Sequence, residues 1–407
     1  MSTPQNMPDM NQRTELKALH IPAPLQGFDA GDAQVFDLVL AGGLVESIAP
    51  STQREARGIV LSAFVEAHAH LDKNYTVRDV GAAKGDLFAA IERMSRHRAG
   101  WTHADLHQRM TRALHDAWRS GTRALRTHLD WIDTTPPLSL EVFKQLREEW
   151  RGRVELQCVA LVPLDVFADH AAGERIARDV RDAGGVLGAF VYRNDDLEHK
   201  LSRVFDLAQQ HGLALDFHVD EGLDADATGL RSIAQLVLER GFAQRVVCGH
   251  ACSLSMQDDA AANDTLALCA KAQIHIVALP TTNLYLQGAW HRTPLERGIT
   301  RVREAAAAGV QTSFATDNVQ DAFYPYGNYD LLESFALGVQ VAHLPDALDW
   351  LGAITVHPAT AMGLAWDGRI APGCPADLVV LTAADEYDLM SPRGRQRSVF
   401  RAGQLLE

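Results

Sequence analysis

Two histidines two positions apart are the first residues in this chain whose types and spacing could do chemistry. His68 and His70 stand in the segment Glu66-Ala-His-Ala-His-Leu-Asp72, at the end of an apolar run typical of a β-strand. Side chains two apart on a strand face the same side, so both imidazoles would point to one place and could hold one metal ion. The pair alone is a weak signal, because the chain contains 17 histidines and two solvated side chains can share this spacing.

Three further polar residues end other candidate strands of the chain. His218 ends the fifth, His250 the sixth and Asp317 the eighth of the strands given below. In a barrel of parallel strands the active site is built from the carboxyl ends of the strands, where residues that only pack have no reason to gather. Three imidazoles and one carboxylate suit a divalent ion such as zinc or iron and leave an open position for water. The pattern therefore predicts a hydrolytic metal site.

Glu221 and the remaining histidine, His250, are candidates for moving protons beside that ion. Glu221 follows His218 by three residues, and without this context it would be read as a solvated loop carboxylate. A divalent ion lowers the pKa of bound water to about 7, and a positioned carboxylate can take the released proton and pass it on. Some barrel hydrolases hold two ions with a lysine at the end of the fourth strand. Here that strand runs Gly-Ala-Phe-Val-Tyr-Arg-Asn194 and has no lysine, so one ion is expected.

The elements that must position these residues recur regularly along the chain. Short apolar runs alternate with helical periodicity, as in Leu201–Gln210 and Gly229–Arg240, and after the first run their starts recur roughly every 28 to 36 residues. Eight such units predict an α/β fold, a (β/α)8 TIM barrel; an open doubly wound sheet is disfavoured because no glycine-rich phosphate loop follows a strand. The expected strands are Leu61–Leu71, Arg123–Asp130, Glu155–Leu161, Gly185–Val191, Leu213–Val219, Arg245–Ala251, Gln273–Leu279 and Gly309–Asp317.

Short strands outside this repeat are expected near both ends of the chain, and we assign them to one small β-domain. They are Val35–Leu40, Val45–Ile48, Gly58–Leu61, Ala376–Leu381 and Val399–Leu405. The predicted division is a flexible tail at residues 1–15, the β-domain at 16–61 plus 356–407, and a catalytic barrel at 62–355.

The composition is that of a globular protein, with 47% hydrophobic and 22% charged residues. A net charge of −14 would repel a nucleic-acid polymer. No stretch reaches the ~18 apolar residues of a membrane span, the first residues lack the apolar core of a signal peptide, and the five cysteines lack paired spacing. We therefore expect a soluble, cytoplasmic protein that acts on a small molecule, with neither a nucleic-acid nor a membrane partner.

A series of segments, in order from about residue 30 to the end of the chain, matches the pattern of a known family. They are Phe64-Val-Glu-Ala-His-Ala-His-Leu-Asp72, Gly85-Asp-Leu-Phe88, Arg126-Thr-His-Leu-Asp130, Asp216-Phe-His-Val-Asp-Glu221, Asn283-Leu-Tyr-Leu-Gln-Gly288, Arg297-Gly-Ile-Thr-Arg-Val302, Thr316-Asp-Asn-Val-Gln-Asp-Ala-Phe-Tyr-Pro325 and Gly368-Arg-Ile-Ala-Pro-Gly-Cys-Pro-Ala-Asp-Leu378. In these segments the chain resembles the amidohydrolase superfamily, and more closely the bacterial cytosine deaminases.

The resemblance implies a set of roles and a reaction. Glu221 would be the proton shuttle and His250 would steady the attacking hydroxide. The reaction would be attack on a C–NH2 carbon of a heterocycle and loss of ammonia, with one divalent ion, zinc or iron, as the cofactor. The resemblance also implies a β-sandwich formed from the two termini and a homo-oligomer. By this resemblance the metal ligands are His68, His70, His218 and Asp317.

Departures from the cytosine deaminase pattern concern the substrate. Pro163 is followed by Leu164, where those enzymes place a glutamine that reads the amide edge of the pyrimidine. Asn318 replaces an acidic residue, and Phe323 stands where tryptophan is usual. Since a site that pairs a polar edge can discriminate by about 10⁴ or more, we expect a substrate other than cytosine, more apolar near Leu164. Leu87, Leu164, Asn318 and Phe323 are the substrate-binding candidates.

The leading hypothesis is thus a metal-dependent hydrolytic deaminase of a small amino-substituted N-heterocycle. The run Asp317-Asn-Val-Gln-Asp also resembles aminotriazine hydrolases that release an alkylamine, which is the second hypothesis, and pterin and creatinine-like rings stay open. A non-catalytic barrel is disfavoured, because every expected ligand and Glu221 are present. His128, which ends the second expected strand, is interpreted as structural, with Asp130 as its partner.

Overall fold

The computed structural model describes residues 13–406, and the chain divides into two compact units. The larger unit comprises Glu66–Asp116 and Ala124–His343, and the smaller one combines both ends of the chain with Ala117–Arg123. Residues 1–12 of the predicted tail lie outside the described part. The prediction is wrong for residues 13–15, which open strand β1 (Arg13–His20). Residues 344–355 belong to the smaller unit and not, as expected, to the barrel.

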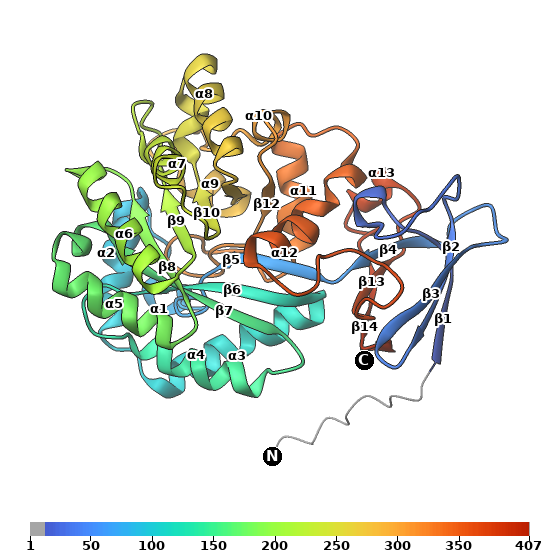
Figure 1. Cartoon of the computed structure of the whole chain (residues 1–407). Coiled ribbons are helices and arrows are strands. Elements are labelled where there is room, and N and C mark those ends of the chain that lie inside the picture. The colour runs from blue at the N-terminus through green and yellow to red at the C-terminus, as the bar shows by residue number, and fades with distance from the viewer. Residues whose placement is uncertain (1–12, 407) are drawn as a thin grey trace. The chain divides into compact units, whose positions relative to one another are not determined.

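Eight strands form the centre of the fold and follow one another in chain order around the sheet (Figure 1). Each expected strand overlaps an observed one, so the predicted α/β barrel is confirmed. The last strand joins the first only through the parallel bridge of Ala69 with Asp317, where the Asp317 amide donates to the His68 carbonyl at 2.9 Å. The strands are β5 (Phe64–Ala69), β6 (Thr122–Asp130), β7 (Glu155–Pro163), β8 (Val186–Val191), β9 (Leu215–Val219), β10 (Val246–His250), β11 (His275–Ala278) and β12 (Thr312–Phe314).

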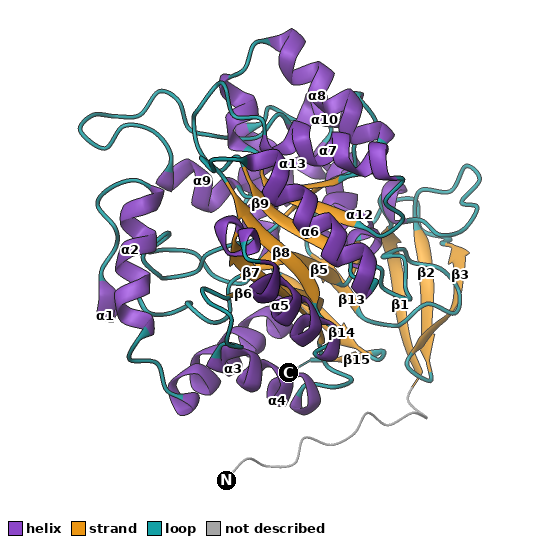
Figure 2. Cartoon of the chain, turned by 60° about the vertical axis from the view of Figure 1, so that its left-hand side comes forward, coloured by secondary structure: helices purple, strands orange, loops and turns teal. Residues whose placement is uncertain are grey.

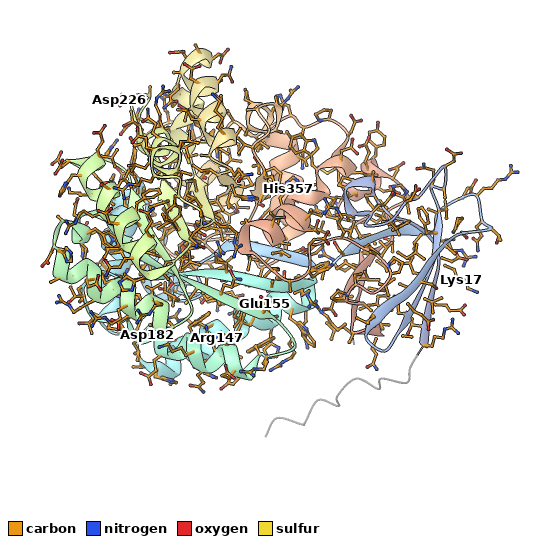
Figure 3. The ribbon with its side chains drawn as sticks, viewed as in Figure 1. Lys17, Arg147, Glu155, Asp182, Asp226 and His357 are labelled. Carbon is orange, nitrogen blue, oxygen red and sulfur yellow. The ribbon has the colours of Figure 1, made fainter. Side chains whose placement is uncertain are left out.

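Helices follow these strands and pack around the sheet (Figure 2). Helix α5 buries one face: Ile176, Ala177 and Val180 are buried, whereas Asp182 of α5 and Arg147 of α4 lie on the outer side (Figure 3). The helices are α1 (Val77–Val80), α2 (Leu87–Arg98), α3 (His103–Ser120), α4 (Leu138–Glu149), η2 (Leu164–Ala168), α5 (His170–Asp182), α6 (Leu197–His211), α7 (Gly229–Arg240), η3 (Cys252–Met256), α8 (Asp259–Lys271), α9 (Pro280–Leu286), α10 (Val302–Ala307) and α11 (Leu331–Val341). Within residues 13–406 none of the helices is long and apolar enough to cross a bilayer.

The smaller unit contains a seven-stranded sheet with the order β15-β14-β13-β4-β1-β2-β3. Its strands come from both ends of the chain, as predicted, and meet where β4 pairs antiparallel with β13. Alternate residues Phe36, Leu38 and Leu40 of β2 are buried, which is the pattern of a strand with one covered face. The strands besides β1 are β2 (Phe36–Ala41), β3 (Leu44–Pro50), β4 (Gly58–Ser62), β13 (Leu378–Leu381), β14 (Arg397–Arg401) and β15 (Gln404–Leu405). The helical segments of this unit are η1 (Ala23–Leu25), η4 (Ala347–Ile354), α12 (Val356–Met362) and α13 (Glu386–Leu389).

Candidate metal centre and active-site pocket

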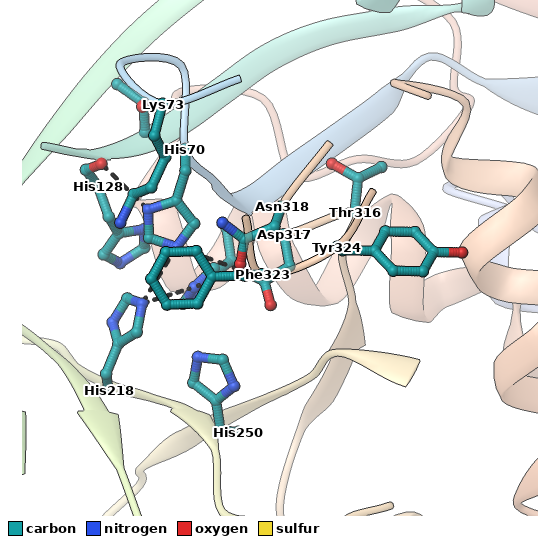
Figure 4. Close-up of polar contacts among 12 residues, drawn as sticks. His70, Lys73, His128, His218, His250, Thr316, Asp317, Asn318, Phe323 and Tyr324 are labelled. Atoms are coloured by element: carbon teal, nitrogen blue, oxygen red, sulfur yellow. Dashed lines mark hydrogen bonds and ion pairs between the residues drawn. The ribbon is translucent and has the colours of Figure 1, made fainter. Parts of the chain in front are cut away.

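Four side chains converge at the carboxyl ends of β5, β9 and β12 (Figure 4). The Nε2 atom of His218 lies 3.2 Å from Nε2 of His68 and 3.2 Å from Nε2 of His70. The Oδ1 atom of Asp317 lies 3.1 Å from Nε2 of His70 and 3.5 Å from Nε2 of His68. All four side chains are buried. The structure therefore brings together the four residues that the sequence singled out as ligands.

These separations fit donor atoms around one ion. Two ligands at ~2.0–2.1 Å from a tetrahedral zinc ion lie about 3.3 Å from each other. Within residues 13–406, the two carboxylate oxygens of Asp317 accept no hydrogen bond of good geometry, although both are buried. Burial, and after it the neighbouring histidines, lowers the pKa of His68 and of His218 well below the ordinary value. Both imidazoles are therefore neutral, as metal ligands must be, and the cluster could hold a divalent ion.

The backbone around the cluster is strained in a way typical of functional sites. Asp220, His250 and Asp317 adopt φ values of 48°, 70° and 60°, in the left-handed region that residues other than glycine rarely occupy. Burial opposes ionisation of the Asp317 carboxyl, but the contact with His70 and the electrostatic interaction with the His250 ring outweigh it and lower the pKa of Asp317. Asp317 is thus an anionic donor at the end of a strained turn.

Glu66 and Gly249 shape the site, and sequence reasoning missed both. The Glu66 carboxylate accepts from the His68 amide at 3.0 Å and from the Thr316 amide at 3.1 Å, so it ties β5 to the segment after β12. Burial raises the pKa of Glu66 to about 7. A Cβ at Gly249 would lie 2.8 Å from Cε1 of His68, so this position of β10 leaves room for the ligand imidazole. Glu66 could have been found, because it precedes His68 by two residues and shares its face of the strand.

Glu221 and His250 form a second pair beside the cluster. The Nδ1 atom of His250 lies 3.4 Å from Oε1 of Glu221 and accepts from the Asn283 amide at 3.1 Å. Burial lowers the pKa of His250 to about 4, so the ring is neutral and carries its proton on Nε2. Burial, and then the charge of Asp317, raises the pKa of Glu221 well above the ordinary value. The pair thus offers an imidazole N–H donor and a carboxyl group able to hold a proton. Asn283, which orients His250, begins one of the segments that match the family, but the sequence alone did not indicate its role.

A pocket of about 700 Å³, its open mouth included, lies against these residues. His70, His218, Glu221 and His250 line its polar end. We call this end the floor of the pocket, together with His68 and Asp317. The opposite, apolar part, which we call the wall, is formed by α2 and the ends of neighbouring strands. The wall residues that matter below are Leu87, Ile91, Met94, Trp131, Phe190 and Phe323.

The substrate-binding candidates have different outcomes. Leu87, Asn318 and Phe323 line the pocket. Leu164 is not among the lining residues: it begins η2 with no exposed surface, and the neighbouring Pro163 lines the pocket instead. Leu164 is fully buried at the start of η2, and its contact with the substrate stays a prediction.

Charged side chains also line the pocket, and two of them, Lys73 and Arg98, were not expected from the sequence. Asp130, expected as the partner of His128, pairs with these two cations instead. Lys73 donates from Nζ to Oδ1 of Asp130 at 2.7 Å, and Arg98 of α2 binds the other carboxylate oxygen. Lys73 also lies 5.0 Å from the ring centroid of Phe323. The two cations outweigh the effect of burial and lower the pKa of Asp130. Lys73 directly follows the segment Glu66 to Asp72, and its charge beside a ligand motif was a usable signal.

The chain is similar to known proteins in sequence and in fold. A model of the amidohydrolase family matches residues 144–404. The pterin deaminase of Rhizobium rhizogenes is 39% identical over 382 residues, which cover 91% of this chain and 87% of that protein. Two solved structures are similar in fold. The 5-methylcytosine deaminase from Klebsiella pneumoniae has a TM-score of 0.85 at 26% identity and covers 97% of both chains. The N-isopropylammelide isopropylaminohydrolase from Burkholderia multivorans has a TM-score of 0.77 at 25% identity and covers 96% of this chain and 98% of its own.

Proposed function

This chain belongs to the amidohydrolase family, and from that premise we propose that it is a metal-dependent deaminase of pterin-type rings that releases ammonia. The observation that carries the proposal is the convergence of three imidazole nitrogens and one carboxylate oxygen, 3.1 to 3.5 Å apart in the contacts described above, on the floor of an apolar pocket. One divalent ion, zinc or iron, would be held by His68, His70, His218 and Asp317. When bound, such an ion lowers the pKa of water and polarises the substrate.

The remaining steps belong to side chains of the floor. Glu221 lines the pocket, and its carboxyl group can take a proton from water and pass it on. Glu221 would deliver this proton to the leaving amino nitrogen, because that nitrogen must be protonated before the C–N bond breaks. His250 presents its Nε2–H as a fixed hydrogen-bond donor, because Asn283 occupies Nδ1. The floor therefore removes a proton from the nucleophile and delivers one to the leaving group.

The wall supports a flat aromatic substrate. Trp131, Phe190 and Phe323 line the pocket, and aromatic side chains suit contact with the face or edge of a flat ring. Asn318 donates its amide to Asp321 at 2.6 Å, which leaves its carbonyl oxygen to accept from a ring or exocyclic N–H. The pterin deaminase is also 39% identical to this chain over an alignment that covers 91% of it. Pterin, a fused 2-amino-4-oxo ring system with ring N–H groups, meets these conditions.

A substrate panel tests this proposal. Purified protein loaded with zinc or iron is incubated with pterin, isocytosine, cytosine, 5-methylcytosine, creatinine and N-isopropylammelide, and ammonia and isopropylamine are measured separately. We expect ammonia from pterin with a kcat/KM at least about 100-fold above the other rings, since buried polar edges discriminate by factors of that order or more. Isopropylamine from N-isopropylammelide without ammonia from pterin would establish the aminotriazine hypothesis instead. Absence of bound metal after reconstitution would overturn the hydrolytic site itself.

A further inference from the structure

His128 is buried against the ligand cluster, yet the chemistry proposed above gives it no task. It belongs to β6, exposes none of its surface and lies beside His70 in Figure 4. Its own backbone carbonyl accepts a hydrogen bond from Nδ1 of His70 at 3.3 Å. A carbonyl oxygen can only accept, so this contact places the His70 proton on Nδ1 and leaves Nε2 free toward Asp317 and His218.

The ring of His128 packs against two other ligand rings. Its centroid lies 4.0 Å from that of His68 with an interplanar angle of 31°. It also lies 4.8 Å from the centroid of His218 at 75°. The imidazole therefore meets the face of one ligand ring and the edge of the other, and limits rotation of both.

A chain of buried polar contacts fixes the His128 ring in turn. Its Nε2 lies 3.1 Å from Oδ1 of Asp216, whose other oxygen accepts from Nη1 of Arg126 at 2.8 Å. Arg126 also binds the Oε1 atom of Gln157 at 2.9 Å. Asp216 and Arg126 are buried, so their ion pair is held in one arrangement and breaking it would leave an uncompensated charge. The ring angle of His128 is thus set by β7 and β9 as well as by β6.

We propose that His128 is a positioning residue for the metal centre: its carbonyl orients His70, and its anchored ring holds His68 and His218 at their coordination angles. The inference rests on the proposed metal site. A competing arrangement makes His128 a ligand itself, because donor atoms of His68, His128 and His218 lie within 4.8 Å of one another. Asp216 engages Nε2 of His128, so ligation would have to use Nδ1, which has no hydrogen-bond partner within residues 13–406, and the His128→Phe variant below tests that arrangement.

Three substitutions separate these roles. His128→Ala removes the ring, His128→Gln keeps an amide that can reach Asp216 but removes the ring, and His128→Phe keeps a flat ring without a nitrogen. Each protein is loaded with Zn²⁺, and zinc release to dipicolinate is timed. A parallel sample is loaded with Co²⁺, and its visible spectrum reports the coordination geometry. We expect zinc release to be about 10–100-fold faster in the Ala and Gln variants, the usual cost of losing an outer-shell partner. The Phe variant should stay within a few-fold of the unsubstituted protein and keep its cobalt spectrum.

The controls make each outcome decisive. His275→Ala removes another buried strand histidine, which bonds Ser313 at 2.7 Å, and should leave zinc release unchanged. If His128→Phe releases zinc as fast as His128→Ala and changes the cobalt spectrum in the same way, the nitrogen matters and the packing proposal is wrong. Unchanged release in both the Ala and Gln variants would also overturn it. If the unsubstituted chain binds no metal, the proposed function fails, whereas unaffected variants of a metal-binding chain refute only the role of His128.

Discussion

The floor and the wall of the pocket are held in place in different ways. On the floor, every predicted metal ligand has at least one polar contact below 3.6 Å with a residue from another strand or its following loop. On the wall, Leu87 and Phe323 belong to an apolar cluster, and Ile91 packs against it. Directional contacts fix atoms to within fractions of an ångström, whereas apolar packing fixes only shape and volume. We therefore expect the floor to determine the reaction and the wall to determine which ring is admitted.

The largest effect that this comparison predicts is on the floor. Glu221→Gln should lower kcat by about 10²–10⁴, because the amide cannot carry a proton although it fits the same space. Metal content should stay stoichiometric, because all four predicted ligands remain. The check is steady-state kinetics with pterin together with metal analysis of the same preparation.

Asp220→Asn is the matched control for this substitution. Asp220 is also a buried carboxyl, but it accepts from the Gly229 and Leu230 amides at the start of α7 and does not line the pocket. Its variant should retain most of the turnover. Turnover at the level of the unsubstituted protein in Glu221→Gln would refute the shuttle role.

The next effect concerns retention of the ion. Asp317→Asn removes the anionic ligand and should weaken metal binding by more than the roughly 10–100-fold that loss of an outer-shell partner causes. Dialysis against a chelator followed by metal analysis measures this. Metal content equal to that of the unsubstituted protein after dialysis would remove Asp317 from the ligand set.

The floor could be predicted from the sequence because its rules are local. The period of two along a strand places His68 and His70 on one face, and polar residues that end apolar runs must meet at one rim of a parallel barrel. The residue types at these positions, three histidines and one aspartate, then suffice to predict a metal site. The roles of Asn283 and Gly249 were not predicted, because neither residue has metal or proton chemistry of its own. Asn283 acts through its contact with His250, and Gly249 acts by leaving room for His68.

The wall could be predicted only in part. Leu87 and Phe323 were expected from the family resemblance, but the other wall residues were not, because the contacts of the pocket are tertiary. Lys73 and Asp130 are 57 positions apart and meet only after β5 and β6 have paired. Helix α2 reaches the pocket through a loop whose path no periodicity specifies. Leu164 was expected at the substrate by analogy with a related motif, and in the structure it begins a 3-10 turn after Pro163 and is fully buried.

The burial of Leu164 yields a prediction of intermediate size. Because Leu164 is fully buried, Leu164→Ala should lower the free energy of unfolding by about 2–5 kcal/mol, the usual range for a core leucine. The KM for pterin should not change. Urea unfolding and steady-state kinetics on the same variant test both halves, and a raised KM without loss of stability would return Leu164 to the substrate site.

The smallest effect lies on the wall. Ile91 of α2 lines the pocket and is only partly buried, so Ile91→Ala should raise the KM for pterin by about 10-fold, the low end of what lost apolar contact in a pocket costs. Metal content and kcat should stay close to those of the unsubstituted protein, because the floor is untouched. Glu92→Ala, at the next and exposed position of the same helix, is the control and should change neither constant. If Ile91→Ala instead lowered kcat or metal content, helix α2 would be holding the floor as well, and the two regions would not be separable.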